Sequence, residues 1–73
     1  MDHELYKALK TKYKAVIREQ DYNVKVRLKT PTLIPEHINI VEEIDKAIQM
    51  IADYEERLET LEKLHDETYP CYH

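Results

Sequence analysis

The side chains best suited to chemistry gather at the C-terminal end of the chain. His65, Asp66, Cys71 and His73 are ligand types that zinc accepts, and a thiol near an imidazole can also form a nucleophilic pair. The spacing of the four residues matches no standard structural zinc pattern. No group that would orient the thiol is evident either. We therefore expect no metal, no cofactor and no catalytic residue, which favours a chain that is not an enzyme.

The composition excludes further classes of site. The 73 residues include no glycine and no serine, so a glycine-rich phosphate loop and a serine nucleophile are both ruled out. The single cysteine, Cys71, cannot form an intrachain disulfide and is typical of a reducing compartment. No apolar run is long enough to cross a membrane, and residues 1–10 lack the apolar core of a signal peptide. We expect a cytoplasmic protein, of a cell or of an infected host cell.

The element around which the chain is organised is a long amphipathic helix from Pro35 to Glu67. Apolar residues recur there at steps of three or four, from Ile34 to Leu64, which is the spacing of one helix face. Pro35 suits the first helical position and Pro70 cannot continue the helix. Asn39 with Glu42 has the form of a capping box and marks an alternative start. The apolar stripe is broad before Asp53 and narrow after it.

Two shorter segments precede this helix. Residues 2–20 have the spacing of a first helix, about 27 Å long, which is too short to cover the narrow half of the long helix. Residues 22–29 alternate instead, with Val24, Val26 and Leu28 between basic residues, which is typical of a strand or an extended connector. Residues 30–35 hold two prolines and predict a turn. Residues 68–73 predict a flexible tail.

We therefore expect residues 1–73 to form a single small all-α domain, a helical hairpin with an extended connector, in an oligomer. A chain of this size is marginally stable alone, and the narrow stripe beyond the first helix needs a second copy to cover it. The expected oligomer interface is Tyr54, Leu58, Leu61 and Leu64. The expected core is Leu9, Tyr13, Val16, Val41, Ile44, Ile48 and Ile51.

The charge is divided between the two halves of the chain. Residues 1–30 hold eight basic and four acidic side chains, net +4, whereas residues 31–73 hold three and eleven, net −8. The halves can attract each other within a chain or between subunits. Lys25, Arg27 and Lys29, with Tyr22, are candidates to contact a protein partner or phosphates. This basic segment resembles the entry strand of ribbon–helix–helix repressors, but the uninterrupted helix after it does not, so no family is assigned.

These observations favour a small non-catalytic interaction protein, such as a regulator, an assembly chaperone or an inhibitor of a larger protein. A compact, charged chain without glycine would also suit a virus-encoded accessory factor. The expected partners are a second copy of the chain and another protein, with no membrane. Two alternatives stay open: a nucleic-acid-binding regulator that uses residues 22–29, and a sponge for an anionic small molecule at a subunit interface.

Overall fold

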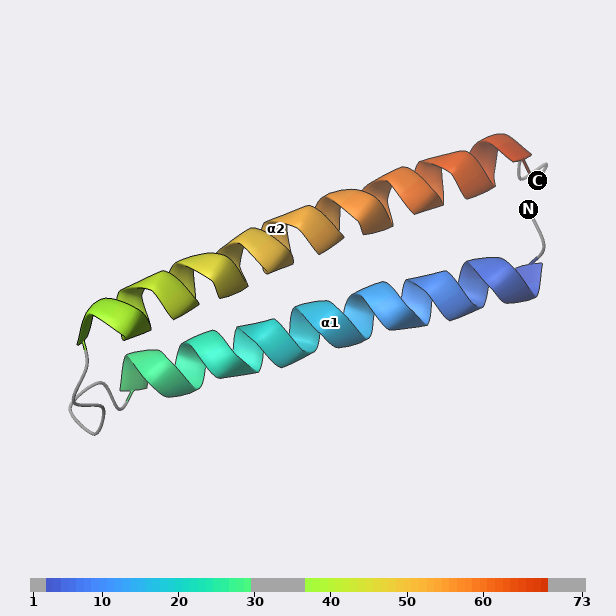
Figure 1. The fold of residues 1–73 in the computed structure, drawn as a ribbon. Helices are drawn as coiled ribbons and strands as arrows, with labels where there is room; N and C mark the ends of the chain where they lie inside the picture. The colour runs from blue at the N-terminus through green and yellow to red at the C-terminus, as the bar shows by residue number, and fades with distance from the viewer. Residues whose placement is uncertain (1–2, 30–36, 69–73) are drawn as a thin grey trace.

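The chain folds into two α-helices that pack side by side. A computed structural model describes residues 3–29 and 37–68, and these form α1 (His3–Lys29) and α2 (His37–Thr68). The helices run in opposite directions, so the start of α1 lies beside the end of α2 (Figure 1). Neither described segment contains a strand. The prediction of an all-helical chain with two helices is therefore confirmed.

Helix α1 is longer than the sequence pattern indicated. It runs without a break from His3 to Lys29, over 27 residues, so the predicted strand or extended connector at 22–29 is wrong. The reason is visible in the packing: half-buried positions continue at helical spacing beyond residue 17, through Gln20, Val24 and Arg27. Two of these three side chains are polar, so the helical period was not visible as a pattern of apolar residues. The alternation of Val24, Val26 and Leu28 was the stronger pattern in the sequence.

Helix α2 matches the predicted long helix closely. It spans 32 residues, from His37 to Thr68, so the alternative start at Asn39 is wrong. The Thr68 hydroxyl donates a hydrogen bond of 2.9 Å to the Leu64 carbonyl oxygen in the last turn. The predicted turn at 30–35 and the rest of the predicted tail, residues 69–73, lie outside the described residues.

The core between the helices is thin. Among the described residues only Ile40, Ala47 and Leu61 are buried apolar side chains. Five of the expected core residues are half-buried: Leu9, Tyr13, Val16, Ile44 and Ile51. The other two, Val41 and Ile48, are 68% and 50% exposed, so their assignment to the core of one chain is wrong. The α2 side chains that face α1 most directly include Ile40 and Ala47, which precede Val41 and Ile48 by one residue each.

The expected oligomer interface is largely used within the chain. Leu61 is buried, Leu58 is half-buried, and Tyr54 makes an edge-to-face contact with Tyr13, with 5.6 Å between ring centroids. Leu64 alone of the four is exposed. That interface was predicted because a first helix ending at residue 20 would leave the narrow stripe uncovered. Since α1 extends to Lys29, it runs beside most of the length of α2 (Figure 1).

Opposite charges face each other across the pair. Helix α1 carries eight basic and three acidic residues, net +5, and α2 carries three and ten, net −7. Arg27 bonds Glu43 across the seam through an ion pair that is partly exposed. Within α2, Asp53 pairs with Arg57 at 3.0 Å, in the acid-first order at four-residue spacing that the sequence favours.

Candidate interaction surface

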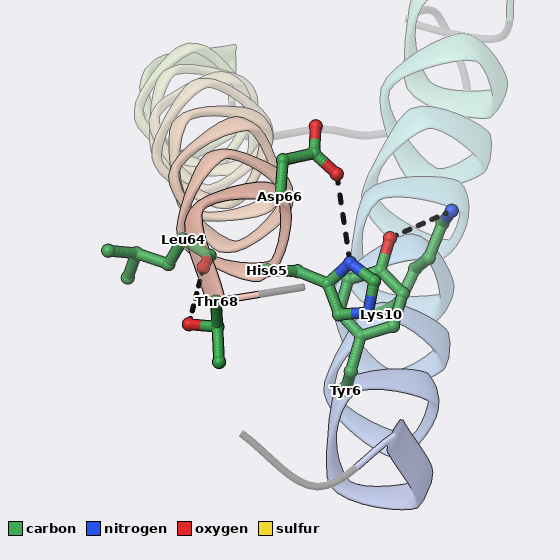
Figure 2. Close-up of polar contacts among 6 residues, drawn as sticks. All are labelled: Tyr6, Lys10, Leu64, His65, Asp66 and Thr68. Atoms are coloured by element: carbon green, nitrogen blue, oxygen red, sulfur yellow. Dashed lines mark hydrogen bonds and ion pairs between the residues drawn. The ribbon is translucent and has the colours of Figure 1, made fainter. Parts of the chain in front are cut away.

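An aromatic stack joins the two helices at the end of the pair where α1 begins and α2 ends. His65 of α2 lies over the ring of Tyr6 of α1, with centroids 3.8 Å apart (Figure 2). Nδ1 of His65 lies 3.7 Å from Asp66, and Lys10 donates a hydrogen bond of 3.4 Å to the Tyr6 hydroxyl. His3 lies 6.0 Å from the His65 ring. The ring contacts of His65 with Tyr6 and His3 join the two helices and use the imidazole of His65 for packing.

The C-terminal residues considered for zinc are only partly described. His65 and Asp66 lie in α2, whereas Cys71 and His73 lie outside the described residues. Within residues 3–29 and 37–68, no group of three or more His, Cys, Asp and Glu side chains is arranged to hold a metal ion. The described part of the chain therefore offers no metal centre on which chemistry could be built.

The basic segment does not form a ribbon. Successive alternate residues of a helix turn by about 200°, so Arg27 points away from Lys25 and Lys29, which lie four residues apart on the same side of α1. Lys25 pairs with Asp21 at 2.9 Å, and Arg27 pairs with Glu43 of α2. Tyr22 is 68% exposed. Three of the four residues predicted as one partner or phosphate site, Tyr22, Lys25 and Lys29, thus share one exposed side of α1, whereas Arg27 is turned toward α2, and two of the three cations already have acidic partners.

One face of the helix pair is hollowed by a groove of about 410 Å³ that has both apolar and charged side chains in its lining. Leu9 and Tyr13 of α1 form one wall, and Leu61 and Leu64 of α2 lie opposite. The guanidinium carbon of Arg57 lies 4.5 Å from the centroid of the Tyr54 ring. We call this the Leu64 groove; its lining residues are Leu9, Tyr13, Asp53, Glu56, Arg57, Thr60, Leu61 and Leu64. Of the expected interface residues, Leu61 and Leu64 thus meet at a groove that other apolar groups can enter.

A second groove, of about 480 Å³, is lined by different positions of the same two helices. Its lining residues are Lys14, Ile17, Arg18, Asp21, Glu55 and Leu58. On α2 the Leu64 groove uses positions 53, 57, 60 and 64, which lie on the other side of the Tyr54–Leu61 seam by helical spacing. The two grooves therefore belong to the two broad faces of the pair.

An apolar patch extends from the second groove toward the other end of the molecule. Seven residues are almost two helical turns, so a residue seven positions away lies on nearly the same face. By this rule Val24, Lys25 and Leu28 follow Ile17, Arg18 and Asp21 on α1, so one charged side chain lies beside the two apolar ones. The α2 positions preceding Glu55 and Leu58 are apolar. We call this surface the Ile48 face; it consists of Val24, Leu28, Val41, Ile44, Ile48 and Ile51.

The exposure of the Ile48 face is high for apolar side chains. Leu28 is 62% exposed, and Val41 and Ile48 are the two side chains wrongly expected in the core. The signal was present in the sequence, because the apolar stripe of α2 is broad before Asp53. A single neighbouring helix covers only one side of a broad stripe. Sequence reasoning assigned both sides of the stripe to α1.

Comparison with protein-family models, with curated proteins and with solved structures finds no match for this chain. Neither described helix is long and apolar enough to cross a membrane. The described surface is therefore the basis for the function proposed below.

Proposed function

We propose that this chain is a small non-catalytic interaction protein, a regulator, assembly chaperone or inhibitor, that binds another protein and acts as an oligomer. The observation that carries the proposal is the imbalance between buried and exposed apolar side chains. Only three apolar residues are buried among those described, whereas eight large ones are exposed. Three of the eight, Leu28, Val41 and Ile48, belong to one face, and apolar side chains that gather on one exposed surface are typical of a protein that completes its packing on a partner.

The Leu64 groove fits a partner helix. It runs between two helices and presents leucine and tyrosine side chains beside polar ones, the arrangement used in helix-in-groove recognition. Its rim carries Asp53 and Glu56, while Arg57 already pairs with Asp53. We therefore expect an amphipathic partner helix, with apolar anchors at helical spacing and a basic residue placed against Glu56.

The two alternatives from the sequence have less support. A phosphate-binding ribbon needs several free cations on one surface, but Lys25 and Arg27 are paired with acidic residues. An anion sponge also needs excess positive charge, whereas Asp53 and Glu56 in the Leu64 groove outnumber Arg57. The net charge of −4 opposes both.

The test begins with a pull-down from lysate in the presence and absence of nuclease, followed by reconstitution with the purified prey protein. We expect to capture a protein whose association with the chain persists after nuclease treatment and which binds the purified wild type. Leu64→Asp should weaken this binding by at least about tenfold, because a charge would replace an apolar side chain that a partner's apolar anchor would contact. The matched control, Val26→Glu, adds a charge at an exposed apolar residue outside the groove and should bind as the wild type does.

Two results would overturn the proposal. One is a prey set that disappears with nuclease, together with tight, salt-sensitive binding of the wild type to duplex DNA. The other is equal affinity of the wild type and Leu64→Asp for every reconstituted prey, which would remove the groove from recognition.

A further inference from the structure

The Ile48 face needs an occupant of its own. Its apolar side chains lie at the end of the pair where α1 finishes and α2 begins, on the face opposite the Leu64 groove. Leu28, Val41 and Ile48 are each at least half exposed in the single chain. A partner helix seated in the Leu64 groove would leave all three uncovered.

A stable interface of standard size buries roughly 800 Å² on each partner. The chain exposes 5970 Å², whereas a compact monomer of 8.8 kDa exposes about 4800 Å², because the helix pair is elongated. With dimensions of 55 × 19 × 15 Å, one broad face of the pair has room for such an interface.

We propose that the Ile48 face is covered by the same face of a second copy, so that two chains form a four-helix bundle. This inference deepens the proposed function, because it names the surface by which the interaction protein becomes an oligomer. A two-fold dimer buries the same patch of both chains, which removes both exposed patches at once. It also leaves the Leu64 grooves free on the two outer faces.

The charges on this face select the arrangement of the two copies. Beyond the apolar end, α1 presents Lys14 and Arg18, and α2 presents Glu55 and, seven residues on, Glu62. A two-fold axis parallel to the helices places α2 of one copy on α1 of the other, running in opposite directions. Acidic residues then meet basic ones at one end, while Val41 and Ile44 meet the partner's Leu28 at the other.

The other two-fold axis in the plane of the interface is disfavoured. Perpendicular to the helices, it places α1 on α1 and α2 on α2. With full overlap it brings Lys14 close to the partner's Arg18 and Glu55 close to the partner's Glu55, so that like charges meet. Overlap of the apolar ends alone would produce a much longer particle. The parallel axis satisfies both the apolar residues and the charges.

The test combines molar mass and particle size. By light scattering at about 100 µM, the wild type should have twice the mass of the 8.8 kDa chain. Its melting temperature should rise with concentration, as for any folded dimer of marginal monomers. Because two layers lie about 10 Å apart, the radius of gyration should be only about 17 Å, against 16.6 Å for one chain.

Variants locate the interface. Ile48→Asp and Val41→Asp should lower the apparent mass to that of one chain. The matched control Leu5→Asp changes an equally exposed apolar residue that belongs to neither groove nor patch, and it should remain dimeric. Lys14→Glu with Arg18→Glu should be monomeric alone. It should regain the dimer mass when mixed with a chain carrying Glu55→Lys and Glu62→Lys.

The inference is overturned by a wild type of 8.8 kDa with a melting temperature independent of concentration. It is also overturned if Ile48→Asp and Val41→Asp leave the dimer intact. A dimer whose radius of gyration is much larger than about 17 Å would overturn it as well. If Ile48→Asp unfolds, the concentration dependence and size of the wild type still decide. Failure of the proposed function would appear separately: Leu64→Asp would bind every reconstituted prey protein as tightly as the wild type does, while the dimer would be unchanged.

Discussion

Apolar residues of one helix stripe have different environments in this protein. Leu61 lies in the seam and is 6% exposed, whereas Ile48 lies on the edge of the same stripe and is half exposed. The steps of three and four residues between them make them look equivalent in the sequence, but 13 residues are about 3.6 turns, so the two side chains lie about 140° apart around α2. What separates them is the position of α1, which covers one side of the stripe. Residue types and spacing predicted the stripe but not which edge the neighbouring helix covers.

Truncation of Leu61 should therefore be costly. Leu61→Ala removes a buried side chain from a core with few others, at an expected cost of roughly 2–5 kcal/mol. In a domain of this size that lowers the melting temperature by roughly 10 °C or more, measured by circular dichroism. Thr11→Ala, on the exposed side of α1, is the control and should change it by only a few degrees. Equal melting temperatures for both variants would mean that Leu61 does not lie in the seam.

At the scale of the element, the long helix was predicted over nearly its whole length, whereas the short one was predicted only over its first two thirds. Helix α2 has an uninterrupted apolar period, so its ends fell within about two residues of those expected. The last third of α1 has both a period of two and a helical period. The second is carried by Gln20, Val24 and Arg27, and only Val24 of these is apolar. Contacts with α2, such as the Arg27–Glu43 ion pair, favour the helix, and a sequence pattern contains no such contacts.

Substitution of proline for Val26 should distinguish a helix from a connector. Proline inside a helix removes a hydrogen bond and clashes with the preceding turn, at a cost of about 3 kcal/mol. Val26→Pro should therefore lower the helical signal in circular dichroism and the melting temperature together. Val26→Ala, which keeps the amide, should leave both nearly unchanged. A stable Val26→Pro variant with full helicity would argue that α1 ends before this residue.

The ion pair between the helices should contribute little by itself. Arg27 and Glu43 are both partly exposed, and such pairs are worth about 0.2–1 kcal/mol in double-mutant cycles. A cycle of Arg27→Ala, Glu43→Ala and the double variant, followed by urea unfolding, should yield a coupling energy in that range. A coupling energy near zero would mean that this contact does not guide the register of α1 on α2.

At the scale of the whole molecule, charge is segregated by helix. The net charges of +5 on α1 and −7 on α2 attract each other within a chain and, in the proposed bundle, between chains. The sequence predicted this attraction but did not show whether it acts within one chain or between two chains. It also indicated that a chain of this size lacks core, but the location of the uncovered surface depended on the length of α1.

Salt should therefore destabilise the protein. The Debye length falls from about 30 Å at 0.01 M to about 8 Å at 0.15 M salt, so screening weakens attraction between the helices over this range. We expect the melting temperature to fall by a few degrees between these two NaCl concentrations at fixed protein concentration. Sucrose of equal osmolarity is the control and should not lower it. A melting temperature that rises with NaCl would indicate that repulsion within α2 dominates.

The antiparallel pairing has a mechanical consequence. The first turn of α1 and the last turn of α2 lie at the same end of the molecule (Figure 1). A force that pulls His3 away from Thr68 would therefore act across the seam and not along it. The contacts would open one after another, first the stack of Tyr6 on His65 and later the contact of Tyr13 with Tyr54. Such a molecule unzips at low force, and the residues at its open end set the threshold.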